Sequence, residues 1–393
     1  MTGEAPPPAP RRAWSLGMGG GAGLALLSLL VAIDLWAMSS TDPDYYLPDP
    51  FRPLGLALIA LFLATGLLGL RARRITRRLG LVLTVVLLVL EARMRWSDDG
   101  SSGLVVKTED VLLRYKYKAG AHFSGPGVDQ HRTINHLGLM DGEHEVPKPA
   151  DVFRVVVLSG SIANDGSVPY DQRFWRVLER ELAGVREGKR VDVVNLSVHG
   201  YSEVQQVRML EKVGLDYQPD LVVAAFMLTA ATIQNGGYRR VGDSFFLFRF
   251  LPPMKVAMSG SICSMFAPLY ERYTYDLVVR NSFERLAMLR RLHGFRALVA
   301  VLPVVEEFDD PVCGRIYDQV VATARDAGLP ALRVPDAFRG ARAEDFAKPD
   351  GRWDVCHPNA AGHAKIAAAI AAGVRAEEAA ARPDAPRAGQ NSE

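Results

Sequence analysis

Hydrophobic residues follow two different patterns along the chain. Before residue 97 they form three long apolar runs, which lie at Gly17–Met38, Pro53–Leu70 and Leu79–Ala92. After residue 150 they form short apolar runs, which alternate with segments whose apolar positions recur every three or four residues. The long runs predict a membrane anchor of three transmembrane helices over residues 17–96. The alternating pattern predicts a separate domain of strands and helices.

Charge in the loops predicts how the three long runs are oriented. The loop after the second run carries Arg71, Arg73, Arg74, Arg77 and Arg78, whereas the loop before it carries three aspartates against one arginine. Because arginine-rich short loops stay in the cytoplasm, we expect residues 1–16 to be a disordered cytoplasmic N-terminus. The large domain would then face the periplasm or the extracellular side of the cytoplasmic (inner) membrane. Two alternatives are open: a cleaved signal peptide in place of the first run, and an interfacial rather than spanning third run.

Short apolar runs predict the strands of the domain, at Phe153–Leu158, Val191–Asn195, Asp220–Met227, Ala297–Val304 and Ala331–Val334. Helical spacing occurs between and after them, at Arg173–Leu182, Glu203–Val213, Tyr275–Leu292, Arg315–Ala327 and Asn359–Ala372. This alternation predicts an α/β fold with a parallel sheet and right-handed crossovers. We expect that domain over residues 151–377, after a linking β-rich segment at 97–150 and before a disordered tail at 378–393.

Composition excludes some classes of function. The chain has 393 residues and a net charge of +2, without a basic stripe, so nucleic acid is not an expected partner. Cys263, Cys313 and Cys356 show no zinc spacing, and His122, His131, His136 and His144 lack the pairing of metal ligands. We therefore expect no cofactor and no metal. A Cys313–Cys356 disulfide in an oxidising compartment is open, and the oligomeric state is not predicted.

Two distant stretches carry candidate chemistry. Ser161 belongs to the small, flexible Ser159-Gly160-Ser161 turn at the carboxyl end of the first strand, where ligands bind in open α/β sheets. His357 is the candidate base that takes the serine proton, and Asp354, three residues earlier, can orient its ring. Taken singly, the serine could be an ordinary turn residue and Asp354 a helix cap, although Asn359 is better placed to cap. His363 is expected to pack or cap rather than react.

The order of these motifs resembles the SGNH (GDSL-type) hydrolase family. Ser161, the segment Asn195-Leu-Ser-Val-His-Gly200 and the segment Asp354-Val-Cys-His357 match its order and approximate spacing, and the lead-in Ile134–Met140 is similar to membrane-anchored bacterial members. The resemblance covers about residues 133–374. It implies a three-layer α/β/α sandwich with a flavodoxin-like sheet and a catalytic triad of Ser161, His357 and Asp354. It also implies an oxyanion hole formed by the backbone N–H groups of Ser161 and Gly200, with Asn195 in a supporting role.

Two positions depart from the family pattern. Gly160 replaces the aspartate that precedes the nucleophile, and Thr229 stands where the family places an oxyanion-binding asparagine. Loss of one oxyanion donor typically costs about 2.7–4 kcal/mol, of which the Thr229 hydroxyl or Asn235 could restore part. The serines of Gly242-Asp243-Ser244 and of Ser259-Gly260-Ser261 are rejected as nucleophiles because neither follows a buried strand. They lie in the insertion 232–275, which would form either a lid or a small satellite core.

These observations predict a membrane-anchored serine esterase of SGNH type, acting outside the cytoplasmic membrane on an O-acyl ester of a glycan or lipid. One alternative is an O-acyltransferase of envelope glycans, in which a sugar hydroxyl rather than water captures the acyl group. The other is a catalytically silent domain that binds a glycan or a partner, and Gly160 and Thr229 are the residues that suggest it.

Overall fold

The computed structural model describes residues 105–121, 134–231, 262–271, 273–305, 308–348 and 357–380. The three apolar runs that predict a membrane anchor lie outside these residues. Within them, no helix combines the length and the apolar character that crossing a membrane requires. This finding contradicts the predicted localisation in the cytoplasmic membrane. The predicted domain limits at residues 97 and 151 stay predictions.

Five parallel strands form the central sheet, namely β3 (Val152–Leu158), β4 (Arg190–Asn195), β5 (Leu221–Phe226), β6 (Arg296–Val301) and β7 (Ala331–Arg333). Their spatial order is β4-β3-β5-β6-β7. Every residue of β3 and β5 is buried, which explains why both read as almost continuous apolar runs. The order is that of flavodoxin-like sheets, so the predicted α/β class and sheet type are confirmed.

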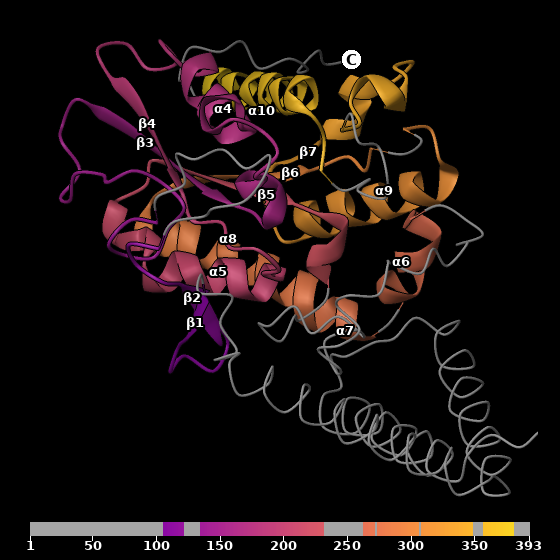
Figure 1. Cartoon of the computed structure of the whole chain (residues 1–393), viewed down its shortest axis with the longest axis horizontal. Helices are drawn as coiled ribbons and strands as arrows, with labels where there is room; N and C mark the ends of the chain where they lie inside the picture. The colour runs from indigo at the N-terminus through magenta and orange to yellow at the C-terminus, as the bar shows by residue number, and fades with distance from the viewer. Residues whose placement is uncertain are drawn as a thin grey trace, which may run out of the picture. The chain divides into compact units, whose positions relative to one another are not determined.

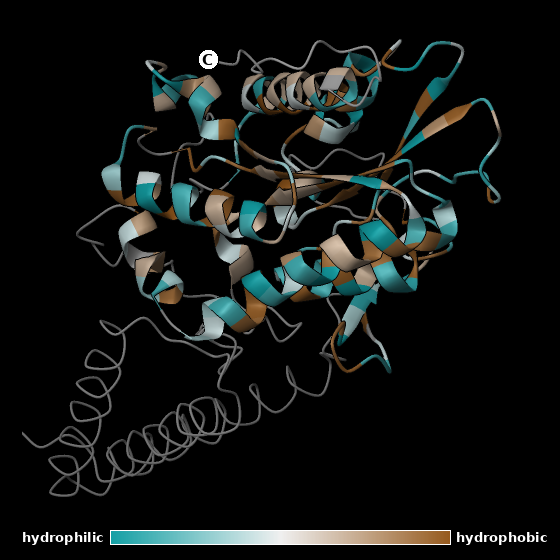
Figure 2. Ribbon diagram, turned by 180° about the vertical axis from the view of Figure 1, so that it is seen from behind, coloured by the Kyte–Doolittle hydropathy of each residue, from teal (hydrophilic) through white to brown (hydrophobic). Residues whose placement is uncertain are grey.

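Helices cover both faces of the sheet, and Figure 1 shows the resulting three layers. One face carries α4 (Phe174–Glu181) and α10 (Ala360–Ala380), and the other carries α5 (Glu203–Lys212), α8 (Asn281–His293) and α9 (Pro311–Asp326). Trp175 and Ile370 of the first pair pack in one apolar cluster with Val155 and Val223 of the sheet. Figure 2 shows the hydrophobic strands between helices whose surfaces are partly hydrophilic. Burial of these apolar faces is what holds the layers together.

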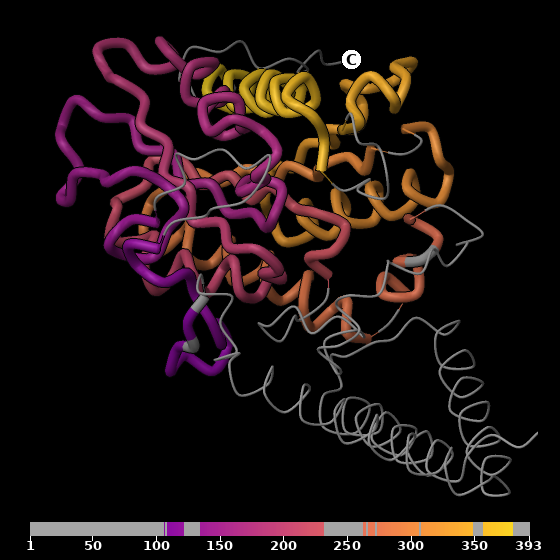
Figure 3. The backbone as a smooth tube through the Cα atoms, in the orientation of Figure 1, coloured from indigo at the N-terminus to yellow at the C-terminus, as the bar shows by residue number. Residues whose placement is uncertain are grey.

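Shorter elements complete the described chain. They are β1 (Val105–Lys107), β2 (Tyr115–Tyr117), η1 (Ser161–Asn164), η2 (Tyr170–Gln172), η3 (Gly214–Tyr217), η4 (Leu228–Ala231), α6 (Ile262–Tyr270), α7 (Tyr273–Tyr275), η7 (Asp276–Arg280), η8 (Val334–Phe338) and η9 (Ala343–Asp345). β1 and β2 pair antiparallel within the predicted linking segment. Figure 3 traces the backbone from these strands, in indigo, to α10, in yellow.

Two helices extend beyond their predicted ends. α9 begins at Pro311, four residues before the predicted start, because the Asp310 carboxylate accepts hydrogen bonds from the N–H groups of Val312 and Cys313, at 2.6 and 3.1 Å. α10 continues to Ala380, although a disordered tail was expected from residue 378. Glu378 is buried there and forms an ion pair with Arg186, with 2.7 Å between Oε2 and Nε. Glu378 is therefore part of the folded domain and not of a disordered tail.

A disulfide joins Cys263 of α6 to Cys313 of α9, with 5.1 Å between their Cα atoms. The sequence left a Cys313–Cys356 bridge open, and the structure instead pairs Cys313 with the cysteine 50 residues before it. Cys356 lies outside the described residues. The bond attaches α6 to a helix that packs on the sheet.

Candidate active site

Ser161 follows the carboxyl end of β3 after a two-residue turn. The hydroxyl of Ser159 donates to the carbonyl oxygen of Ala225 in β5, at 3.1 Å, and so ties the turn to the neighbouring strand. Gly160 has close neighbours, since a Cβ atom added to it would lie 3.2 Å from Sδ of Met227 and 3.8 Å from the carbonyl oxygen of Tyr201. Met227 therefore occupies space that a larger residue at position 160 would need. This contact gives a physical reason for glycine where the family has aspartate.

His357 lies against Ser161, although 196 residues separate them in sequence. Its Nε2 atom is 2.7 Å from Oγ of Ser161, which is hydrogen-bond distance. Asn359 fixes the chain beside it: the Oδ1 atom accepts from the N–H of Gly362, at 3.0 Å, and the Nδ2 atom donates to the carbonyl oxygens of Asp345 and Ala347. Asn359 thus holds the start of α10, as the sequence indicated. The geometry brings the predicted nucleophile and base together, and their roles stay a proposal.

Asp354 lies outside the described residues, so its contact with His357 stays a prediction. A second carboxylate, that of Asp165, is buried close to the site and was not predicted from the sequence. Burial raises the pKa of Asp165, but the N–H of Ser167 and the charges of Lys348 and His357 outweigh this effect and hold the pKa below its ordinary value. Asp165 therefore stays ionised and places a negative charge near His357.

The loop after β4 carries the predicted oxyanion donor Gly200, whose φ of +75° suits glycine. Asn195 at the end of the strand is completely buried. Its Nδ2 atom donates to Oδ1 of Asn164, at 2.8 Å, and its Oδ1 atom accepts from the N–H of Ser197, at 3.1 Å. Asn164 in turn donates to the carbonyl oxygen of Ser197, at 2.7 Å. Asn195 therefore ties the serine-bearing turn η1 to the glycine-bearing loop, as a supporting residue would.

Two tyrosines of β2 brace this loop from the linking segment. The hydroxyl of Tyr115 donates to the carbonyl oxygen of His199, at 2.5 Å. The hydroxyl of Tyr117 lies against Nδ1 of the His199 ring and accepts from the N–H of His199, at 2.9 Å, and from Nδ2 of Asn164, at 3.2 Å. Sequence reasoning missed both residues. The alternation in Tyr115-Lys116-Tyr117, with both tyrosines on the buried face, was the signal available.

Thr229 lies in η4, directly after β5, and is half-buried. Together with Ile162, the residue after Ser161, it lines a small apolar recess of about 10 Å³. The position predicted to face the oxyanion is therefore near the serine turn, on the carboxyl side of the sheet. Asn235 and the rejected serines Ser244 and Ser261 lie outside the described residues.

His363 is completely buried and takes no part in the Ser161 contact. Its Nδ1 atom accepts from the N–H of Phe174, at 3.0 Å, and its ring stacks on that of Phe174. Burial lowers the pKa of His363 to about 3, so the ring stays neutral and packs α10 against α4. Across the described ranges, no group of three or more His, Cys, Asp or Glu side chains could hold a metal ion.

Comparison with known proteins gives matches in solved structures. No family model matches the chain, and no curated protein matches it. The crystal structure of TesA is 16% identical over 56% of this chain and 97% of its own, with a TM-score of 0.37. Axe2, an acetylxylan esterase from Geobacillus stearothermophilus, is 14% identical over 58% of this chain and 96% of its own, with the same TM-score. The psychrotrophic esterase EstA from Pseudoalteromonas sp. is 11% identical over 57% and 98%, with a TM-score of 0.36.

The assignment of the chain rests on its own residues. The sheet has the flavodoxin-like order, the serine leaves the carboxyl end of its first strand, and the histidine that precedes the last helix meets that serine. In sheet order, in motif order and in the Ser161–His357 contact, the chain resembles the SGNH (GDSL-type) hydrolases.

Proposed function

We propose that the domain hydrolyses O-acyl esters, with Ser161 as nucleophile and His357 as general base. The observation that carries this proposal is the 2.7 Å separation of Oγ and Nε2 at the carboxyl end of β3. Oγ attacks the ester carbonyl carbon while Nε2 takes the hydroxyl proton. The protonated imidazole then gives this proton to the leaving alkoxide, and an acyl-serine forms. Water attacks the acyl-serine with the same histidine as base, which releases the acid and restores Ser161.

Two sets of groups are proposed to stabilise the reaction, one around the oxyanion and one around His357. The backbone N–H groups of Ser161 and Gly200 are the proposed oxyanion donors, and the hydroxyl of Thr229 is the third. Asp354 is proposed to hold the His357 ring through Nδ1. Asp165 adds a buried negative charge near the site, and the charges of Lys348 and His357 help to keep the pKa of Asp165 below its ordinary value.

The proposed substrate class is an O-acyl ester of a glycan or a lipid. An O-acyltransferase would form the same acyl-serine and would differ only in the group that attacks it, a sugar hydroxyl instead of water. The two activities are separated by adding a sugar acceptor during turnover and identifying the acyl product.

A fluorophosphonate probe tests the nucleophile, because it modifies only an activated serine. We expect the wild-type chain to be labelled and Ser161→Ala to lose the label completely. Ser244→Ala and Ser261→Ala are the matched controls and should keep it. Labelling that survives in Ser161→Ala removes this residue from the role, and an unlabelled wild type would favour a catalytically silent domain.

A further inference from the structure

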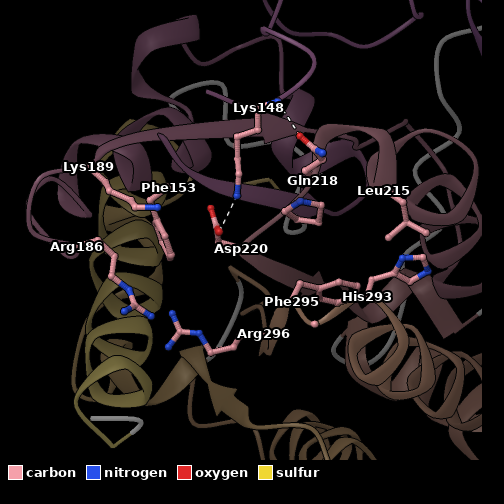
Figure 4. Close-up of a pocket in the computed structure, with 12 residues that line it drawn as sticks. Lys148, Phe153, Arg186, Lys189, Leu215, Gln218, Asp220, His293, Phe295 and Arg296 are labelled. Carbon is pink, nitrogen blue, oxygen red and sulfur yellow. Dashed lines mark hydrogen bonds and ion pairs between the residues drawn. The ribbon is translucent and has the colours of Figure 1, made fainter. Parts of the chain in front are cut away.

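A cavity of about 720 Å³ lies at the amino ends of the strands, at the opposite end of the sheet from Ser161. Phe153 near the start of β3, Asp220 before β5 and Arg296 at the start of β6 contribute to its wall. Figure 4 shows Lys148, Arg186 and Lys189 around the same space. With about 3.3 Å of rise per residue, the length of β3 separates this cavity from Ser161 by on the order of 20 Å. A ligand bound here would not occupy the proposed catalytic site.

Positive charge exceeds negative charge around the cavity. Its cationic side chains are Lys148, Arg186, Lys189 and Arg296, with His293 at one side. Two carboxylates oppose them: Asp220 pairs with Lys148, at 2.6 Å, and Glu378 pairs with both arginines. Glu377 is close enough to act on Arg296, but it lines a neighbouring cavity together with Arg290. Four cations against two carboxylates leave an unbalanced positive field inside a concave surface, which concentrates anions.

The two arginines form the centre of this field. Figure 4 shows the side chains of Arg186 and Arg296 extending toward each other. Burial and the charge of Arg186 both lower the pKa of Arg296, so the two guanidinium groups repel each other. Among the described residues, the buried Nη1 atom of Arg296 has no hydrogen-bond partner. An oxyanion beside the two groups would reduce the repulsion that remains after their pairing with Glu378, and it would accept a hydrogen bond from Nη1 of Arg296.

We propose that this cavity binds a small, multiply charged phosphate-type oxyanion between Arg186 and Arg296, with Lys189 as a further cation beside them. A planar guanidinium offers two parallel N–H groups, which match the oxygens of a phosphate. The phosphate group could belong to a free small molecule or to a lipid headgroup, since both present the same oxygens. The site is separate from the proposed esterase chemistry and does not depend on it.

Calorimetric titration of the full chain with inorganic pyrophosphate tests the proposal. The double variant Arg186→Gln, Lys189→Gln removes two of the cations and should weaken binding by about tenfold or more, because hydrogen bonds to charged groups are lost. The matched control Arg180→Gln, Arg315→Gln removes the same charge from exposed positions outside the cavity lining and should bind like the wild type. Ser161→Ala should also bind like the wild type. Arg296 is left in place so that buried Glu378 keeps one of its two arginine partners when Arg186 is replaced.

A second titration identifies the source of the phosphate. Dihexanoyl-phosphatidic acid, used below its micelle concentration, presents a lipid headgroup that is a phosphate monoester, without a membrane. If pyrophosphate binds and this lipid does not, the ligand is a free phosphate compound. If the lipid binds and the cavity variant loses it, the headgroup is the source. No binding of either probe, or equal weakening by the cavity variant and the control variant, overturns the proposal. Melting curves of all variants must show that the fold is retained.

Discussion

At the residue scale, the hydroxyl group of Tyr117 connects the loop that carries Gly200 to the turn that carries Ser161. Tyr117 contacts His199 in the glycine-bearing loop and Asn164 in the serine-bearing turn. All three residues are far apart in sequence, and no local pattern in the chain links them. The contact between Ser161 and His357 could be predicted because each residue lies in a short sequence motif of its own. Tyr117 and Asp165 could not, since their roles arise from contacts that only the folded chain creates.

The Tyr117→Phe variant tests this link. It removes the hydroxyl that accepts from the N–H of His199 and from Nδ2 of Asn164, and the loss of these two hydrogen bonds should cost about 1–3 kcal/mol in stability. Because His199 precedes Gly200, we also expect kcat to fall by roughly tenfold, with a smaller change in KM. The control is Tyr275→Phe, whose hydroxyl bonds Thr323 between α7 and α9. If Tyr117→Phe loses stability but keeps its kcat, the tyrosine contributes to the stability of the fold and not to catalysis.

Thr229 is the residue at which an enzyme and a silent domain would differ. In an enzyme with a weakened oxyanion hole, Thr229→Asn restores an amide donor and should raise kcat by up to roughly a hundredfold, with little change in KM. Thr229→Val should lower kcat for the same reason. Ester hydrolysis by the three proteins measures this directly. If the wild type is fast and Thr229→Asn slows it, Thr229 is itself an adapted donor or a substrate contact. If Thr229→Asn gives no turnover at all, the site favours the silent domain.

At the scale of secondary-structure elements, the sequence predicted strands better than helix ends. β3 and β5 were predictable because strands buried on both faces are apolar throughout. α9 starts earlier than its apolar spacing indicates, since its first turn is set by the Asp310 cap and by Pro311. The end of α10 was predicted as tail because alanine and glutamate are also common in disordered segments. Its helical state depends partly on the pairing of Glu378 with Arg186, which the sequence does not show.

The Cys263–Cys313 disulfide links α6 to α9 covalently, and its removal is predicted to destabilise the domain. The bridged cysteines are 50 residues apart, and closing a loop of this length typically contributes about 2–4 kcal/mol. We expect Cys263→Ser to lower the free energy of unfolding by that amount in urea titrations under oxidising conditions. Cys356→Ser is the matched control and should leave it unchanged. Equal stability of wild type and Cys263→Ser without reductant would show that the bridge contributes nothing.

At the scale of the whole molecule, the two ends of the parallel sheet carry different chemistry. The carboxyl ends hold the serine, the histidine and the loop of Gly200, while the amino ends hold the cationic cavity. Between them, at the β4 edge, lies a buried ionic network. His144 contacts Oδ2 of Asp141, at 3.0 Å, and Oδ1 of Asp192, at 2.9 Å. Nε of Arg154 forms an ion pair with Oδ2 of Asp192, at 2.9 Å. The network connects the segment before β3 to the sheet.

This network makes stability depend on pH. Burial acts to lower the pKa of His144, but its hydrogen bonds to Asp141 and Asp192 and their charges raise it to about 9. A histidine whose pKa is higher in the folded than in the unfolded state stabilises the fold fully below its unfolded pKa of about 6.5. That contribution decreases by roughly 1.4 kcal/mol per pH unit above 6.5 and is lost as the pH passes through 9.

The His144→Gln variant isolates the contribution of this histidine, since other groups titrate in the same range. Burial raises the pKa of Glu203 to about 8, so its ionisation also destabilises the wild type as the pH rises. Urea unfolding of wild type and variant at pH 6, 8 and 10 subtracts that shared effect. We expect the wild type to be clearly more stable at pH 6 and the difference to shrink at pH 8 and to vanish at pH 10. His136→Gln is the control, because His136 pairs with Glu143 on the surface and should change little at any pH. A difference between wild type and His144→Gln that is constant with pH would mean that His144 is neutral in the folded protein and contributes through packing alone.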